Sequence, residues 1–149
     1  MKRITALILA VIMLFTLASC GATVGEQGDV TFVIENRDGS YDVYKMYLED
    51  VTNKDKGALG VIESLNAREN NPLPVDMAGT WMNSIGDLVP VTAGNEYIAI
   101  YTSLERDFDT SEYFTTLAYE GITLGSSGFG IADMSVESGI VILFRIQTF

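Results

Sequence analysis

The stretch "DVTFVIENRDGSYDVYKMYLE", residues 29–49, sets the expected fold. Two runs rich in β-branched and aromatic residues flank the turn signal Asp38-Gly39, and this arrangement is typical of a β-hairpin. The second run also carries tyrosines at positions 41, 44 and 47, a spacing that suits a helix. Because Asp-Gly is a strong signal for a tight hairpin turn, we interpret both runs as strands.

The chain after this hairpin predicts one helix and then several strands. In "KGALGVIESLNARE", residues 56–69, apolar residues fall on one helical face, with Asn53 or Asp55 available as N-cap. The prolines of "NNPLPVD", residues 70–76, exclude a helix there. Four strand-like runs follow: "TWMNSIG" (80–86), "EYIAIYTS" (96–103), "FTTLAYEGITL" (114–124) and "GIVILFRIQTF" (139–149). Because helix and strands do not alternate, this order favours an α+β fold in which one helix lies across a sheet.

The composition restricts the possible functions. The chain of 149 residues has 9 basic and 20 acidic residues, so nucleic acid, which is bound by Lys and Arg clusters, is not an expected partner. It has no histidine, which excludes Ser-His-Asp and Cys-His chemistry and histidine-ligated zinc. We therefore expect no catalytic residue, no metal site and no cofactor. The enzymatic alternative is a carboxylate-dependent glycoside hydrolase, since two carboxylates suffice for that reaction.

The N-terminus is typical of a bacterial lipoprotein signal. A basic start is followed by an apolar run that ends at Ala18, and this run is shorter than the ~20 residues that a membrane-spanning helix needs. Leu17-Ala18-Ser19-Cys20 resembles the lipobox, which implies cleavage before Cys20 and acylation of its sulfur. Cys20 is the one cysteine of the chain, so an intramolecular disulfide cannot form. We expect an anchor in the bacterial cell membrane that faces the extracytoplasmic side.

These features divide the chain into three parts. Residues 1–19 are expected to be the signal peptide, residues 20–28 the lipidated cysteine and a short tether, and residues 29–149 a single domain. Removal of Lys2 and Arg3 with the signal leaves 7 basic and 20 acidic residues, a formal charge of 7 − 20 = −13. Such a surface favours solubility and is repelled by an anionic leaflet.

Read in order, the elements of the domain resemble the transcobalamin-type C-terminal domain, a β-grasp-like family found in secreted and lipid-anchored bacterial proteins. The resemblance is carried by the opening hairpin, "GALGVIESL" (57–65), "SIGDL" (84–88), "EYIAIYTS" (96–103) and "MSVESGIVILFRI" (134–146). It implies a β-grasp-like mixed sheet with an N-terminal β-hairpin and one helix packed across it. In animal cobalamin carriers the related domain covers one face of the corrinoid, so the resemblance implies contact with a ligand without implying cobalamin binding by this chain alone.

Aromatic residues in loops and at element ends are the candidates for a ligand-binding surface. Flat amphipathic rings stack on sugars or macrocycles and hold partners at small entropic cost. Trp81, Tyr113 and Phe129 occupy such positions. Tyr97 and Tyr101 share one face of a predicted strand with Ala99, which favours a place in the core.

Two loops offer weaker signals. "ERDFDTSE", residues 105–112, gathers four carboxylates that a hard cation such as Ca²⁺ could use, but calcium sites need six or more oxygens, so we interpret it as a solvated acidic loop. "GSSGFG", residues 125–130, lacks the spacing of a phosphate-binding loop and is interpreted as a turn between strands.

Two functions from different classes fit these constraints. The first is a binding module without catalysis that holds a small ligand, such as a corrinoid or a glycan, or a partner domain through its aromatic residues. The second is a structural or interaction lipoprotein of the cell envelope that docks through its sheet edge or acidic face. A ligand site would quench the fluorescence of Trp81 saturably, whereas a docking surface would copurify an envelope protein.

Overall fold

The computed structural model describes residues 21–149, which form a mixed α+β domain, mostly sheet with one α-helix. Its α-helix is α2 (Gly57–Asn66). Its strands are β1 (Asp29–Glu35), β2 (Tyr41–Tyr47), β3 (Val75–Ala78), β4 (Trp81–Ile85), β5 (Glu96–Thr102), β6 (Thr116–Tyr119), β7 (Ile122–Ser126) and β8 (Val141–Thr148). The described part of the chain thus confirms the predicted hairpin, helix and later strands, except that the run 114–124 is broken by a turn at Glu120-Gly121 into the antiparallel strands β6 and β7.

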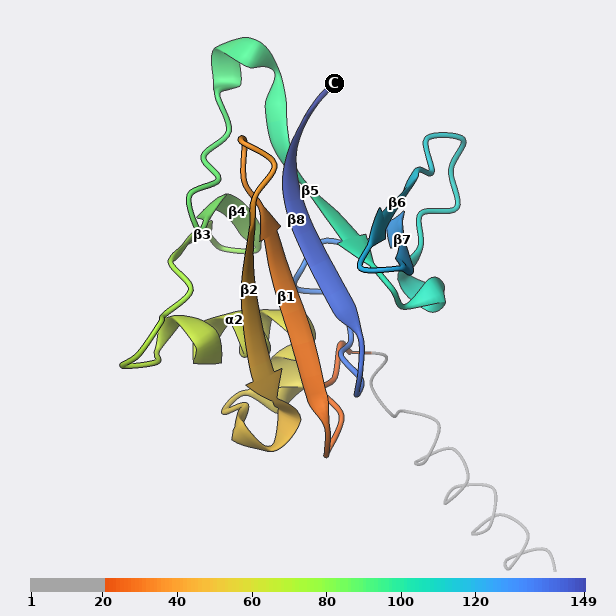
Figure 1. Cartoon of the computed structure of the whole chain (residues 1–149). Helices are drawn as coiled ribbons and strands as arrows, with labels where there is room; N and C mark the ends of the chain where they lie inside the picture. Colours follow the sequence, from red (N-terminus) through yellow and green to blue (C-terminus); the bar gives the residue numbers. More distant parts are fainter. Residues whose placement is uncertain (1–20) are drawn as a thin grey trace, which may run out of the picture.

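Six strands form one twisted sheet in the order β2-β1-β8-β5-β7-β6, and β3 and β4 form a separate two-stranded sheet (Figure 1). The last strand, β8, lies at the centre, parallel to β1 and antiparallel to β5. This position explains why "IVILF" is almost wholly apolar, because both faces of a central strand are covered.

The sheet has a core on each face. On one face, even-numbered residues of β1 and β8 pack with α2 and with the β3–β4 sheet, and Phe32 stacks on Phe144 at 5.8 Å between ring centroids. On the other face, Val33, Leu143 and Tyr101 pack with residues of β6 and β7. Among the described residues, both cores are built within 21–149, so we expect this fragment to fold by itself.

The turn between β1 and β2 follows from its residues. Gly39 has φ +82°, a conformation that glycine adopts without steric cost. The Asp38 carboxylate accepts a hydrogen bond from the Ser40 N–H at 2.9 Å, and the Asn36 N–H donates to the Ser40 carbonyl at 2.8 Å. The local chemistry of Asp-Gly therefore decides between strand and helix for the second run, and the alternative helix does not form.

The start of α2 differs from the predicted cap. Neither Asn53 nor Asp55 caps it, because a short 3-10 turn (Lys54–Lys56) precedes the helix and Lys56 occupies the N-cap position without a side-chain bond. The side-chain amide of Asn53 instead donates to the carboxylate of Glu63, a residue within α2, at 2.8 Å.

The beginning of the described chain is fixed to the domain. Val24 is buried in the first core and forms a β-bridge with Val136, while the Thr23 carbonyl accepts a hydrogen bond from the Val136 N–H at 2.8 Å. Part of the segment 20–28 therefore lies within the domain. Within residues 21–149, no helix has the length and apolar character needed to cross a bilayer.

Candidate functional site

Three aromatic side chains lie at one cavity. Trp81 opens β4, Tyr113 lies in the segment before β6, and Phe129 follows β7. They are exposed over 68%, 78% and 47% of their surfaces, respectively. All three line a cavity with a volume of about 1340 Å³. The structure therefore brings together the three residues that the sequence suggested as ligand contacts.

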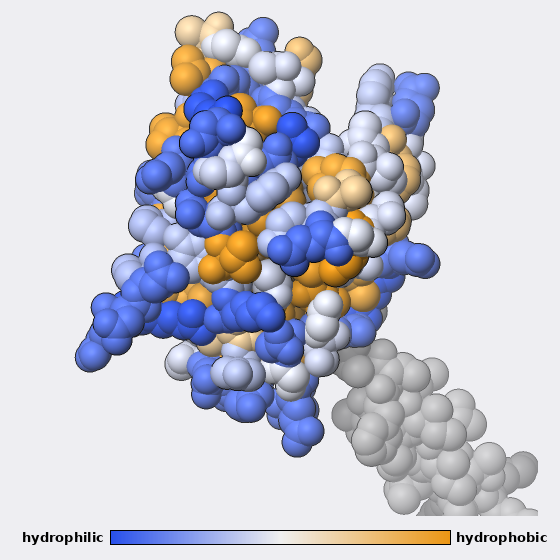
Figure 2. Space-filling model, viewed as in Figure 1, coloured by the Kyte–Doolittle hydropathy of each residue, from blue (hydrophilic) through white to orange (hydrophobic). Residues whose placement is uncertain are grey.

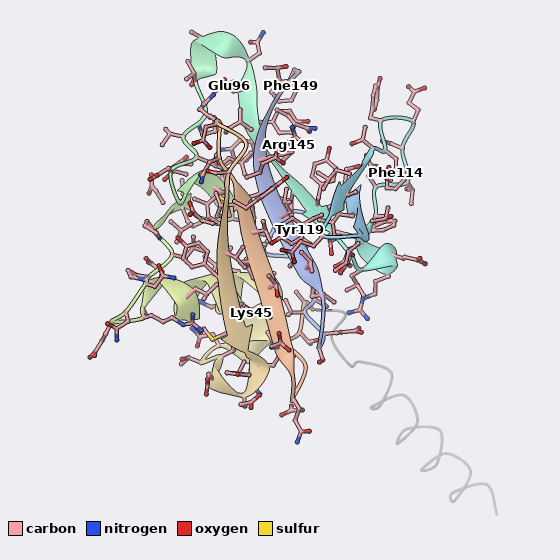
Figure 3. All side chains as sticks on the ribbon, viewed as in Figure 1. Lys45, Glu96, Phe114, Tyr119, Arg145 and Phe149 are labelled. Carbon is pink, nitrogen blue, oxygen red and sulfur yellow. The ribbon has the colours of Figure 1, made fainter. Side chains whose placement is uncertain are left out.

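The cavity is an open hollow beside β5 and β8. In the space-filling view, segment 108–115 projects beside the sheet and a hollow separates the two (Figure 2). Arg145 and Phe149 lie on the sheet side of the hollow and Phe114 lies across from them (Figure 3). The lining comes from β4, β5, β8, the end of β1 with the turn that follows it, and the segments around β7, so the site depends on the tertiary fold.

The hollow exists because β5 is only partly paired on its outer side. Among the described residues, β7 pairs with β5 at Tyr101 and Thr102 alone. The Ser127 N–H still donates to the Ile100 carbonyl at 2.8 Å, and then the chain turns away. The Ser127 hydroxyl holds that turn by accepting a hydrogen bond from the Phe129 N–H at 3.1 Å. The edge of β5 from Glu96 to Ile100 consequently borders the cavity.

The glycines of "GSSGFG" serve packing as well as turning. Gly125 belongs to β7, so the predicted turn begins later than expected. A Cβ atom at Gly125 would lie 2.8 Å from ring carbons of Phe108 and Phe114, whose rings pack at 5.4 Å between centroids. This contact, with the 2.8 Å hydrogen bond from the Asp109 N–H to the Ser126 carbonyl, fixes segment 108–115 to β7 as a wall of the cavity.

A hydrogen-bonded polar group forms one side of the cavity. The Tyr97 hydroxyl donates to the side-chain Oε1 of Gln147 at 2.9 Å, and the side-chain Nε2 of Gln147 donates to the Tyr101 hydroxyl at 2.8 Å. Tyr101 is buried, as predicted, whereas Tyr97 is half-buried and stacks on Phe149 at 4.6 Å. Burial raises the pKa of the Tyr97 phenol, so this group remains a neutral donor at neutral pH.

Four of the charged groups of the lining form ion pairs. Both terminal guanidinium nitrogens of Arg37 donate to the Glu96 carboxylate, at 2.9 and 2.6 Å, and the Val91 N–H donates to the same carboxylate at 2.7 Å. These donors, the Arg37 hydrogen bonds first, lower the pKa of Glu96 to about 2. Arg145 lies 3.4 Å from the Glu35 carboxylate. The site therefore combines aromatic walls with charges that are largely neutralised.

The acidic residues of 105–112 do not converge. Asp107 is buried, and burial raises its pKa, whereas the Asp109 carboxylate accepts hydrogen bonds from the Ser111 N–H and hydroxyl, which lower its pKa. In the part of the chain that the structure describes, no group of three or more carboxylate or thiol ligands could hold a metal ion.

Sequence reasoning missed several residues of the lining, among them Arg37, Gln147 and Phe149. Arg145, Gln147 and Phe149 lie at alternate positions at the end of the chain, on the same face as Tyr97, and Gln147 is the partner of Tyr97 across the β5–β8 ladder. Period-two alternation would have selected them once β8 was known to pair with β5. Cys20, the predicted lipidation site, lies outside the described residues.

Comparison with known proteins bears on the fold. No family model matches the chain, and no curated protein matches it significantly. A solved structure from Ruminococcus gnavus, described as a "putative metal binding protein", aligns over 83% of this chain and 99% of its own, with a TM-score of 0.52 and 10% sequence identity. At that identity the likeness shows the fold alone, which is a mixed α+β domain with a six-stranded sheet and a small second sheet.

Proposed function

We propose that this chain is a lipid-anchored, extracytoplasmic binding module of bacteria, without catalytic activity, whose ligand occupies the cavity beside β5. The observation that carries the proposal is the convergence of Trp81, Tyr113 and Phe129 on one cavity from three separate segments. Exposed aromatic side chains around a concave site are typical of ligand and partner recognition.

The arrangement of the sheet supports a β-grasp-like domain of the transcobalamin C-terminal type. An N-terminal hairpin leads to a helix that lies across one face, and the hairpin strand β1 runs parallel to the last strand, β8. The antiparallel hairpin, the helix of "GALGVIESL" and the strand of "EYIAIYTS" are compatible with this proposal and support it.

The position of the N-terminus supports presentation of the cavity away from the membrane. The first described segment lies near the start of β8, where Val24 bridges Val136, whereas the C-terminal Phe149 and the cavity lie toward the opposite end of the sheet (Figure 1). If Cys20 carries acyl chains, Val24 is already bound to the domain, so the spacer can reach at most about 14 Å. A domain held this close to the bilayer would still expose the cavity.

The charges at the cavity favour binding over hydrolysis. A glycosidase needs a general acid whose pKa is raised. In the cavity, hydrogen bonds lower the pKa of Glu96 to about 2, and Asp107, whose pKa is raised, does not line it.

An interaction lipoprotein of the envelope is the second candidate, and one observation favours it. One face of β2 exposes Tyr41, Val43 and Tyr47 at alternate positions, with Lys45 between the last two. Copurification of one envelope protein that is lost on Tyr47→Ala, with no ligand response at the cavity, would support this function instead.

Titration of the fragment 21–149 with cobinamide, cobalamin and a panel of glycans tests the proposal. Trp81 is the one tryptophan of the chain, so its fluorescence reports on the cavity directly. We expect a saturable change in fluorescence and a rise in melting temperature with ligand concentration.

Matched tyrosine variants locate the binding. Tyr113→Ala removes an exposed ring from the cavity, and we expect it to weaken binding by about 10-fold or more, within the range for a stacked aromatic contact. Tyr47→Ala removes an exposed ring on β2, outside the cavity, and should leave affinity unchanged. Equal effects of both variants would contradict a site at this cavity.

A further inference from the structure

The free edge of β5 is a recessed strand edge with unused main-chain groups. We infer that the ligand of the proposed cavity is an extended peptide of a partner protein, which adds to β5 as a further antiparallel or parallel strand. The inference rests on the proposed function and names the class of ligand. Peptides bind sheet edges in this way because main-chain hydrogen bonds supply affinity and side-chain pockets supply specificity.

The direction of the main-chain groups follows from the hydrogen bonds at both ends of β5. The Ser103 N–H donates to the Val141 carbonyl and the Phe149 N–H donates to the Asn95 carbonyl, so odd-numbered residues bond to β8. The Ile100 carbonyl accepts from Ser127 on the other side. Even-numbered residues therefore point outward, and among the described residues no strand pairs with Ile98 on that side.

Ile98 thus presents both an N–H and a carbonyl to the cavity, and Ile100 presents an N–H. Along the edge of β5 the outward main-chain groups therefore alternate between N–H donors and carbonyl acceptors, as pairing with a further strand requires. An unpaired edge of this kind is a template for another chain, and natural proteins commonly block such edges.

The cavity lies on both faces of β5. Ile98, Ile100 and Ile131 pack against the first core, whereas Tyr97 and Ala99 belong to the second, and all five line the cavity. Successive side chains of an added strand would point to opposite faces. One set of peptide side chains would therefore contact Ile98, Ile100 and Ile131. The alternate set would contact Tyr97 and Ala99.

The shape of the site favours a peptide over a second folded copy. Trp81 and residues of segment 108–115 line the same cavity as the edge of β5, so this edge is recessed. An extended chain about 10 Å across, including its side chains, can enter such a hollow more easily than the edge of a sheet. The outer edge of β2 is accessible by contrast, but there the Arg68 guanidinium already occupies the outward Lys45 carbonyl at 2.7 Å.

The charges indicate a peptide that is neutral or basic. Arg37 and Arg145 in the lining are paired with Glu96 and Glu35, which leaves the Asp109 carboxylate as the excess charge. The described residues as a whole carry 7 basic and 20 acidic side chains, since Lys2 and Arg3 lie outside them. An acidic peptide would be repelled.

Selection of short random peptides displayed on phage against the fragment 21–149 provides the probe. We expect enriched sequences to alternate apolar residues and to lack acidic ones. The best peptide is then synthesised with N-methyl groups on one or the other set of alternate residues. Only one set faces β5, so methylation of that set should weaken binding by about 10-fold or more, and methylation of the other should not.

Amide hydrogen exchange locates the binding. Bound peptide should slow exchange at Ile98 and Ile100, which face outward, and leave Tyr97 and Ala99, already bonded to β8, unchanged. Enrichment of no peptide, equal effects of the two methylated sets, or unchanged exchange at Ile98 would overturn the inference. If glycans or corrinoids still change Trp81 fluorescence in those cases, the proposed cavity function stands while the peptide inference fails.

Discussion

Glu96 shows how single side chains shape the cavity. Its carboxylate accepts hydrogen bonds from Arg37 and from the Val91 N–H, and the Arg37 guanidinium also donates to the Val89 carbonyl at 2.9 Å. One arginine in the turn after β1 therefore fixes the loop before β5 and the first residue of β5 together. The entrance to the free edge depends on this contact.

The pH dependence of this contact can be predicted. The pKa of Glu96 is lowered from 4.5 to about 2 in the folded protein, so its ionised form stabilises the fold above pH 4.5. That contribution is lost as the pH falls from about 4.5 to about 2. Arg37→Gln removes the first cause of the shift, and the pKa of Glu96 should rise toward its ordinary value, as NMR of the side-chain carboxyl carbon would show.

Arg106→Gln is the matched control, since Arg106 pairs with Glu137 at 2.7 Å on the surface. It should leave the titration of Glu96 in place. A Glu96 midpoint that is the same in Arg37→Gln as in the parent protein would show that the ion pair does not form in solution.

At the scale of single residues, the sequence indicated which residue types would form the site, but it did not indicate which residues would contact one another. Trp81, Tyr113 and Phe129 were recognisable because aromatic residues stood at element edges, where no core position explained them. Arg37 was not recognisable, because its partner lies 59 residues away and the contact depends on the packing of two loops.

Among the elements, α2 is held against the segment before it by very close backbone packing. The Thr52 N–H donates to the Ser64 hydroxyl at 3.1 Å, and that hydroxyl donates to the Gly60 carbonyl at 2.8 Å. A Cβ atom at Gly60 would fall 2.1 Å from the Asn53 carbonyl oxygen, which real Cβ atoms do not approach. Gly60 is therefore required by the approach of two backbones.

Gly60→Ala should destabilise the protein although alanine is the better helix former. The gain in helix propensity is about 1 kcal/mol, whereas displacement of the Asn53 backbone should cost about 2–3 kcal/mol. We expect a net loss of stability in urea denaturation. Asn66→Ala, at the exposed end of the same helix, should change stability by less than about 0.5 kcal/mol. A stabilised Gly60→Ala variant would show that the segment before α2 can move away freely.

The elements themselves were predictable where local chemistry decides them. Asp38-Gly39 fixed the first hairpin, and the apolar face of 57–65 fixed the helix. The cap of α2 was not predictable, because the Asn53 side chain finds a tertiary partner in Glu63 and leaves the cap position to Lys56.

At the scale of the whole molecule, the decisive feature is the path of the chain after β5. β6 and β7 fold over the face of the sheet opposite α2 and create the second core, and β7 leaves β5 after two paired residues. Neither hydrophobic period nor turn chemistry specifies how long two distant strands remain paired. The cavity and the free edge of β5 therefore could not be predicted from the sequence. Some of the residues that line the cavity could be.

The anchor is the remaining prediction at this scale. Since Val24 is bonded to the body of the domain, an acylated Cys20 would hold the sheet beside the membrane with its cavity end outermost. Cys20→Ser removes the acyl acceptor and should move the protein from the detergent-rich to the aqueous phase in detergent phase separation. Ser19→Ala keeps a small residue before the cysteine and should stay in the detergent-rich phase. Retention of Cys20→Ser in the detergent-rich phase would contradict anchoring through acylation of Cys20.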